Sequence, residues 1–472
     1  MKLIKVTFGI LIILIISFCA FHFLSNQNKK ATPKRPDKIL LIIVDTLRAD
    51  HLGCYGYQGA DTKNIDNFAK SGASFSQAIS PIPETGPAVS SILTSLYPYN
   101  HGVRENTTPL PHKNRTLAEI LKKKGFQTAA FTDTFPFRIL YILQGFDYFR
   151  KRIPVKSSEK EAIQAAIGEP LAWLKKNKNK KTFALIHFYD PHMPYTPITL
   201  SQRTQSINYQ GSYTGKFGPL LLLWGKKSTI NKKDVAYMTS LYDDEVKFVD
   251  RCVGIILDEL KKLGYYNRTL IIITADHGES LGEHDYYFDH GDFLYEDQIR
   301  VPLIMRFPNM PEKGKIINAQ VRTIDIMPTI LHILDIDYKG PQDGVSLLPL
   351  IWGKKRLLAT RHAFSESDSI HFRNLNNRGF IEGNKGKHVS LRKDGMKLIY
   401  VPQRPEGEFE LYDLAKDPLE LSNLIEEKPE IAKEMKKALF EWMVKQMKSK
   451  SKKEKLDEEA RKILESLHYI HK

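Results

Sequence analysis

The stretch KILLIIVDTLRADHLGCYGY, residues 38–57, begins with an almost entirely apolar run that ends at Asp45. Short runs of this kind, rich in β-branched residues, are typical of strands buried on both faces of a parallel sheet. Two later stretches repeat the pattern: TFALIHFYDPHMPY at 182–195 and RTLIIITADHGES at 268–280. Helical stretches lie between them, and the alternation predicts an α/β domain with a large, mostly parallel sheet flanked by helices.

Polar side chains follow each of these predicted strands. Asp45 follows the first strand, Asp190 and His192 follow the second, and Asp276 and His277 follow the third. Ligands in such sheets bind beyond the carboxyl ends of the strands, so these groups are expected to converge. Carboxylate and imidazole ligands suit Mn²⁺, Zn²⁺ or Mg²⁺. Ca²⁺ prefers oxygen ligands, so His277 favours Mn²⁺ or Zn²⁺ over it.

A hydroxyl that this metal would activate lies in PETGPAV, residues 83–89. Thr85 precedes Gly86-Pro87 and a plausible helix start, and helix N-termini favour oxyanions such as phosphate or sulfate. A threonine hydroxyl is a weak nucleophile at neutral pH unless a base or a metal assists it. His192 and His290 are candidates to bind an ester oxygen or to protonate a leaving group, although each is also compatible with a structural role.

The chain of 472 residues divides into five predicted segments. Residues 1–25 form a transmembrane signal anchor and 26–37 a linker. Residues 38–340 form the catalytic α/β domain, followed at 341–427 by a smaller antiparallel α+β subdomain. A basic helical tail occupies 428–472.

The anchor prediction rests on the apolar run from Val6 to Leu24, which is long enough to span a bilayer. A cleaved signal peptide is the alternative, but no good cleavage site follows the run. The net charge of +16 is concentrated partly in 26–38 and 445–455, which read as solvated segments or as contacts with anionic lipid. No nucleic-acid motif is visible, so no nucleic-acid partner is expected.

Taken together, these motifs resemble the sulfatase family of the alkaline phosphatase-like superfamily. IIVDTLRADHLGCYGY (42–57) is similar to the family's first metal-binding motif, and PETGPAVSSILTSLYPYNHGV (83–103) to its nucleophile motif. The stretch 242–284, ending in LIIITADHGESLGEH, matches a later core motif, and the resemblance covers roughly residues 38–425.

The resemblance implies the alkaline phosphatase-like/sulfatase fold, a divalent metal and an anionic ester substrate. It makes Asp45, Asp276 and His277 metal ligands. It puts Thr85 at the nucleophile, as a further ligand, and His192 at an oxygen-binding or leaving-group position. Anchored relatives are usually periplasmic or extracellular, so we expect the catalytic domain to lie outside the cytoplasm.

The departures from the family pattern concern the nucleophile. Sulfatases generally oxidise a Cys or Ser to formylglycine within C/S-x-P-x-R, whereas this chain has Thr85 and, in place of the arginine, Val89. A lysine that binds sulfate in the family falls near His290. The pattern of Asp45, Thr85, Asp276 and His277 resembles threonine-nucleophile relatives that act on phosphorus.

Three functions remain open from the sequence. The first is a membrane-anchored, metal-dependent hydrolase of sulfate- or phosphate-type esters. The second is a transferase that passes a phosphoethanolamine- or glycerophosphate-type group to an envelope lipid or glycan. The third is a catalytically silent binding protein on a sulfatase scaffold.

Overall fold

A computed structural model describes residues 35–450, apart from 60, 107, 133–136, 138–139, 152–157, 225–227, 309, 354–361, 368–386 and 403–407. The predicted anchor at 1–25, most of the linker and the last part of the predicted tail lie outside the described residues. Within the described ranges, no helix is both long enough and apolar enough to cross a membrane.

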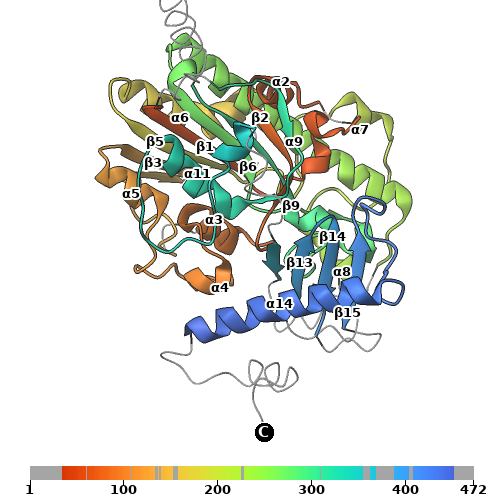
Figure 1. Ribbon diagram of the computed structural model, residues 1–472. Coiled ribbons are helices and arrows are strands. Elements are labelled where there is room, and N and C mark those ends of the chain that lie inside the picture. Colours follow the sequence, from red (N-terminus) through yellow and green to blue (C-terminus); the bar gives the residue numbers. More distant parts are fainter. Residues whose placement is uncertain are drawn as a thin grey trace, which may run out of the picture.

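A nine-stranded sheet forms the centre of the described part of the chain (Figure 1). Its order is β10-β2-β9-β6-β1-β5-β3-β4, with β11 paired to β2. Only β9 runs antiparallel to its neighbours β2 and β6. The strands are β1 (Lys38–Val44), β2 (Ala73–Ile79), β3 (Gln127–Thr132), β4 (Tyr148–Lys151), β5 (Thr182–Phe188), β6 (Thr269–Ala275), β9 (Arg300–Arg306), β10 (Lys315–Ile317) and β11 (Val321–Arg322).

The three predicted buried strands are adjacent at the centre of this sheet, in the order β6-β1-β5, and every residue in them is buried. This confirms the predicted α/β domain. The second strand, β5, ends at Phe188, so Asp190 and His192 follow it as expected. Pro191 and Pro194 have no N–H to donate to a strand ladder, so the segment to residue 195 does not continue the strand.

Helices cover the sheet in two groups. Helix α9 (Lys232–Lys262) contacts α2 (Lys63–Ser71) and α6 (Glu159–Lys176), whereas α3 (Thr85–Thr94) contacts α5 (Leu117–Lys123) and α11 (Ile326–Ile333). The shorter helices are α4 (Pro98–His101), α7 (Gln202–Ser206), α8 (Phe217–Trp224), α10 (Glu296–Ile299) and α12 (Leu348–Ile351). A small hairpin joins β7 (Ser280–Leu281) to β8 (Tyr287–Asp289).

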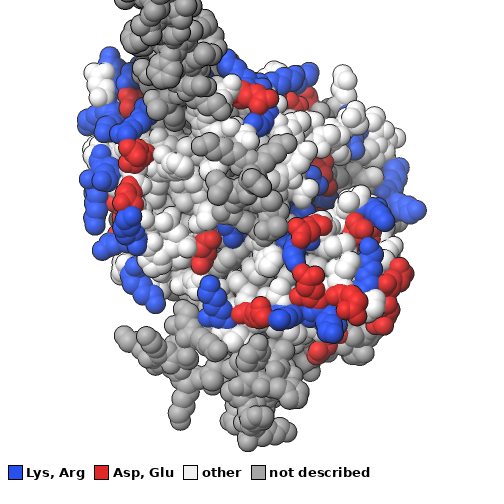
Figure 2. All heavy atoms as spheres, viewed as in Figure 1, with Lys and Arg blue, Asp and Glu red and all other residues white. Residues whose placement is uncertain are grey.

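A second, four-stranded antiparallel sheet forms the smaller C-terminal part, as predicted. Its strands are β12 (Ala363–Glu366), β13 (Val389–Lys393), β14 (Met396–Tyr400) and β15 (Phe409–Asp413). Helix α14 (Pro429–Lys450) lies along this sheet (Figure 1) and buries Ala432, Met435 and Leu439 in the same apolar cluster as Leu391, Leu398 and Leu411. Figure 2 shows basic and acidic side chains interspersed on this face of the molecule.

Buried His101 links the short helix α4 to α3, the helix that begins at Thr85. Its Nε2 lies 2.9 Å from Ser91 Oγ, and its Nδ1 accepts the Val103 N–H at 3.0 Å. Both nitrogens of the neutral ring are therefore hydrogen-bonded. Protonation of Nδ1 would break the hydrogen bond from the Val103 N–H. Burial lowers the pKa of His101 to about 3.

We expect His101 to make folding acid-sensitive. Its folded-state pKa lies below the ordinary value near 6.5, so the unfolded chain binds the proton first and stability falls as pH drops from about 6.5 towards 3. One such group contributes a slope of up to about 1.4 kcal/mol per pH unit. The free energy of unfolding is measured with denaturant at several pH values between 4.5 and 7.5. Plotted against pH, it should change less steeply for His101→Gln than for the natural protein. The exposed His332→Gln should leave the slope unchanged, and equal slopes in all three proteins would refute the assignment.

Candidate metal centre and nucleophile

Three neighbouring strands bring their carboxyl ends to one edge of the large sheet. In the ladder, Val44 of β1 is level with Phe188 of β5 and with Ala275 of β6. Asp45 and Asp276 each follow the last residue of their strand, and both are fully buried. The register thus places the two predicted carboxylates side by side above the sheet edge.

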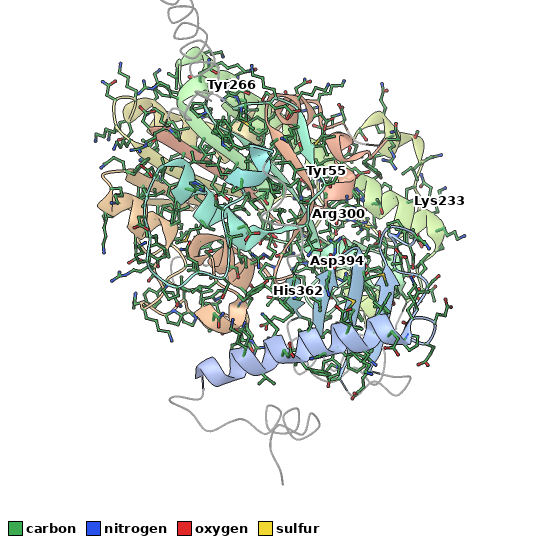
Figure 3. The ribbon with its side chains drawn as sticks, viewed as in Figure 1. Tyr55, Lys233, Tyr266, Arg300, His362 and Asp394 are labelled. Atoms are coloured by element: carbon green, nitrogen blue, oxygen red, sulfur yellow. The ribbon has the colours of Figure 1, made fainter. Side chains whose placement is uncertain are left out.

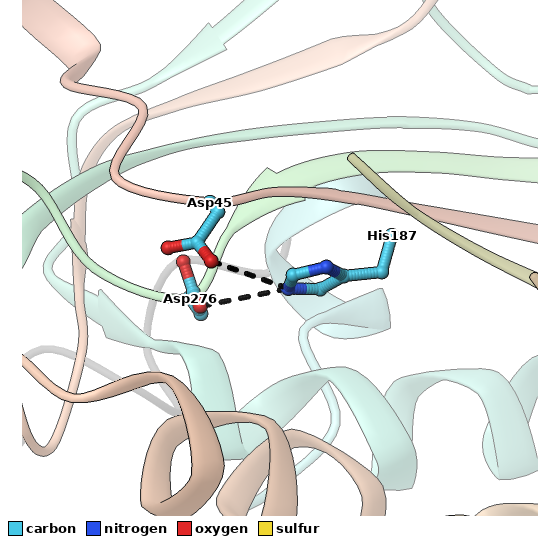
Figure 4. Close-up of side chains that lie close together, drawn as sticks. All are labelled: Asp45, His187 and Asp276. Atoms are coloured by element: carbon cyan, nitrogen blue, oxygen red, sulfur yellow. Dashed lines mark ion pairs between the residues drawn. The ribbon is translucent and has the colours of Figure 1, made fainter. Parts of the chain in front are cut away.

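An imidazole from the third strand completes this group. His187, the penultimate residue of β5, points its Nε2 towards both carboxylates, 4.0 Å from Asp45 Oδ2 and 3.7 Å from Asp276 Oδ2 (Figure 4). One ligand atom from each of the three residues lies within 4.8 Å of the others. Among the described residues, both His187 ring nitrogens and Asp276 Oδ2 are buried without a hydrogen-bond partner.

The donor set fits a divalent cation. A buried polar atom left without a partner costs about 1–3 kcal/mol, a cost that metal ligation would remove. The other oxygen of Asp276, Oδ1, accepts the N–H groups of Thr46 at 3.3 Å and His277 at 2.9 Å, which leaves Oδ2 facing the centre. Burial would raise the pKa of Asp276, but the neighbouring His277 and His187 and the accepted hydrogen bonds lower it to about 2, so its carboxylate is anionic at neutral pH.

His277 faces the same centre from the segment after β6. Its Nδ1 donates to the carbonyl of Gly278 at 2.9 Å, so its Nε2 presents a lone pair. That atom lies 3.7 Å from Asp45 Oδ1 and 3.7 Å from Asp276 Oδ2. Such a backbone bond on the remote ring nitrogen is the usual way in which a metal-binding histidine is oriented.

Thr85 lies directly beside His277. It is the first residue of α3, it is almost fully buried, and its Oγ1 is 3.3 Å from His277 Nε2. The structure therefore brings together all four residues that the sequence proposed as ligands: Asp45, Thr85, Asp276 and His277. The sequence predicted that the N-terminus of this helix favours an oxyanion. One of its N–H groups is already in use, because the Gly86 N–H donates to Asn106 Oδ1 at 2.7 Å.

His192 and His290 line up behind His277. The ring of His290 lies 4.4 Å from that of His277 and 5.0 Å from that of His192. His290 Nδ1 lies 2.9 Å from Glu279 Oε1, which orients its ring. His192 Nδ1 donates to the Met193 carbonyl at 2.6 Å, and burial, followed by the neighbouring His290, lowers the pKa of His192 to about 4. His192 is accordingly neutral at pH 7.

Sequence reasoning missed His187. It lies inside the apolar run of β5, so the pattern indicated only a strand residue. The sequence analysis named Asp190 and His192, which follow the strand, as the candidates. The available signal was an imidazole in a strand that is otherwise apolar and buried. Its meaning depends on the register, because His187 is level with Ile43, two residues before Asp45.

Family models match two overlapping stretches of this chain. A family model described as Sulfatase matches residues 37–336, and one described as N-sulphoglucosamine sulphohydrolase, C-terminal, matches residues 282–448. An ulvan-active sulfatase of Formosa agariphila is 25% identical over 363 residues, which cover 70% of this chain and 69% of the relative.

Two solved structures share the fold. A phosphonate monoester hydrolase of Agrobacterium radiobacter aligns with a TM-score of 0.70 at 24% identity, covering 87% of this chain and 96% of that one. A protein in complex with its substrate D-glucosamine-2-N,6-O-disulfate aligns with a TM-score of 0.71 at 20% identity, covering 88% and 99%.

Proposed function

The chain belongs to the sulfatase family of ester hydrolases, and from this premise we propose that it is a metal-dependent hydrolase in which Thr85 is the nucleophile. One observation carries the proposal: the Thr85 hydroxyl lies 3.3 Å from the lone pair of His277 Nε2, beside the paired carboxylates of Asp45 and Asp276. A threonine hydroxyl that a metal or a base assists is a nucleophile of the kind that ester hydrolysis requires.

Asp45, Asp276 and His277 would hold the metal, with Thr85 as a further ligand and His187 as an additional one. A divalent ion in this position supplies positive charge that favours the threonine alkoxide and the anionic transition state.

The reaction would proceed in two displacements. In the first, Thr85 Oγ1 attacks as the alkoxide and forms a bond to phosphorus or sulfur while the bond to the leaving oxygen breaks, and His290 gives that oxygen a proton. In the second, water attacks the covalent intermediate, Thr85 is released again as the alkoxide, and a proton of the water returns to His290. We assign the proton to His290 because the low pKa of His192 leaves it neutral, which suits it to contact the ester rather than to act as an acid.

A phosphodiester or a phosphonate ester is the substrate class that we favour. Val89, which is fully buried in α3, takes the place of the family's arginine, so the formylglycine chemistry of sulfate hydrolysis lacks its usual support. A less highly charged ester needs fewer cationic side chains. The similarity to a phosphonate monoester hydrolase is consistent with this class.

A panel of three aryl esters tests the proposal: a phosphodiester, a phosphonate monoester and a sulfate monoester, each assayed with Mn²⁺ or Zn²⁺ and again with a chelator. We expect metal-dependent release of the phenol from the first two. Turnover of the sulfate alone would overturn the substrate class. Turnover only after an alcohol acceptor is added would indicate the transferase, and no turnover together with no bound metal would indicate a silent scaffold.

His187 is expected to strengthen metal binding although the family resemblance did not point to it. Replacing it with phenylalanine keeps the ring packing against Phe137, whose centroid is 4.9 Å away, but removes the nitrogen that faces Asp276. We expect the metal dissociation constant to rise by about 10- to 100-fold. Isothermal titration with Mn²⁺ measures it, and an unchanged constant would exclude His187 as a ligand.

We further propose that residues 1–25 anchor the enzyme in a membrane with the catalytic domain outside the cytoplasm. The support is the sequence alone, namely the apolar run from Val6 to Leu24. Fractionation of cells that express the full chain, compared with a chain starting at residue 26, tests it. Recovery of both in the same soluble fraction would contradict the anchor.

A further inference from the structure

Helix α10 (Glu296–Ile299) lies where the large sheet meets the small C-terminal sheet. Arg300, which follows α10 and begins β9, is drawn above Asp394, which joins two strands of the small sheet (Figure 3). Arg300 also lines a cavity between the sheets together with Arg392 and Glu296. This short helix is therefore in contact with both parts of the molecule.

On its catalytic side, α10 holds both loops that carry the active-site histidines. The N–H of Gly278, next to His277, donates to the Gln298 carbonyl at 2.7 Å, and the N–H of Glu279 donates to the Asp297 carbonyl at 3.1 Å. The N–H of Gly291, next to His290, donates to Gln298 Oε1 at 3.2 Å.

The contact at Gly278 is close. A Cβ placed on Gly278 would lie 2.0 Å from the Asp297 carbonyl oxygen, so only glycine allows the loop to approach α10 this closely. A displacement of α10 would consequently be transmitted to the segment that ends β6 and carries His277.

On its other side, α10 is held by charges from the C-terminal subdomain. Lys397 Nζ lies 3.1 Å from Glu296 Oε1, and Arg392 Nη1 lies 3.0 Å from Glu296 Oε2. The Glu296 N–H donates to Glu420 Oε2 at 2.6 Å, and Glu420 Oε1 also pairs with Lys397 at 2.8 Å. We call these four residues the Glu296 clamp: Glu296, Arg392, Lys397 and Glu420.

Stability alone does not account for the clamp. The side chain of Lys397 has no exposed surface, and that of Glu420 is only 1% exposed. Removing charges from water at such a site costs several kcal/mol for each ion, and apolar residues of similar volume are often as stabilising. Ionic pairs do, however, impose a single geometry, because each donor and acceptor must meet its partner within hydrogen-bond distance.

We propose that Lys397 and Arg392 are positioning residues for the metal centre: through Glu296 and α10, the C-terminal subdomain sets the place of the loops that carry His277 and His290. The inference rests on the proposed function, since it assumes that His277 binds a metal. It assigns to the C-terminal subdomain a role in metal affinity.

The test compares two lysines of the same small sheet. Lys397→Met removes the buried ammonium but keeps most of the side-chain volume. Lys393→Met, the matched control, removes an ammonium whose pairing with Glu434 is at the surface. We expect the Mn²⁺ dissociation constant, measured by isothermal titration on folded protein, to rise by about tenfold for Lys397→Met and to be unchanged for the control. Lys397→Arg should restore a large part of the affinity.

The melting temperature separates positioning from stability. If Lys397→Met melts earlier but binds Mn²⁺ as the natural protein does, the clamp is only structural and the inference is wrong. If that variant does not fold, Glu296→Gln, which keeps the shape and loses the charge, gives the same reading: an unchanged constant overturns the inference. A natural protein that binds no metal overturns both the inference and the proposed function, whereas unchanged binding in the variants overturns the inference alone.

Discussion

Replacing Thr85 with alanine is expected to lower kcat on an aryl phosphodiester by at least about a thousandfold, because it removes the hydroxyl that lies 3.3 Å from His277 Nε2 and that we assign as the nucleophile. The fold should persist, since the hydroxyl makes a single, rather long hydrogen bond. Thr85→Ser keeps the oxygen and should retain measurable turnover. The steady-state rate of phenol release, or the same rate followed by stopped flow, measures kcat.

Thr94→Ala is the matched control for this experiment. Thr94 lies at the opposite end of α3, is equally buried, and donates from Oγ1 only to the Ser90 carbonyl at 2.7 Å. Its loss should leave kcat within a few-fold of the natural value. Full turnover by Thr85→Ala would remove Thr85 from the reaction, and mass spectrometry of the trapped Thr85 peptide would show directly whether the group transfers to it.

Replacing Asp276 with asparagine is expected to abolish activity and to weaken metal binding by more than about a hundredfold. The amide keeps an oxygen that can accept the N–H groups of Thr46 and His277, so the local backbone should be preserved. What is lost is the anionic Oδ2 that faces His187, and a neutral amide is a far poorer ligand than a carboxylate. Elemental analysis and Mn²⁺ titration measure the change.

Asp250→Asn provides the control for charge removal. Asp250 is also buried, but it binds the backbone and side chain of Asn64 and the N–H of Ile65 where α2 meets α9. Burial raises the pKa of Asp250 to about 6, and both of its oxygens accept N–H groups, so Asp250→Asn removes a buried, hydrogen-bonded carboxylate that lies away from the proposed metal centre. This variant should bind metal normally. Normal metal content in Asp276→Asn would contradict the proposed ligand set.

The antiparallel strand β9 illustrates what local patterns cannot show. RVPLIMR, residues 300–306, has an apolar centre like that of β6, yet it runs antiparallel to both β2 and β6. The direction of a strand depends on the path of the chain between elements, here the passage through β7, β8 and α10. No periodicity within seven residues encodes that path.

The Glu296 clamp depends on tertiary structure in the same way. Lys397 and Glu420 belong to the C-terminal subdomain, but their partner Glu296 lies about a hundred residues earlier in the catalytic domain. Charged residues in a sequence usually read as exposed. Only the packing of one sheet against the other showed that these are buried.

The sequence by itself determined the three buried strands, the carboxylates that follow two of them and the threonine at the start of α3. It could do so because each is a local feature: an apolar run, the polar residue that ends it, and a turn that begins a helix. Tertiary structure alone decided that His187 lies beside Asp45 and Asp276 and that the ring of His290 lies against that of His277. It also decided that α10 binds the loops that carry His277 and His290. These depend on strand register and on contacts between distant segments, and both are set by packing of the whole domain rather than by any single stretch of the chain.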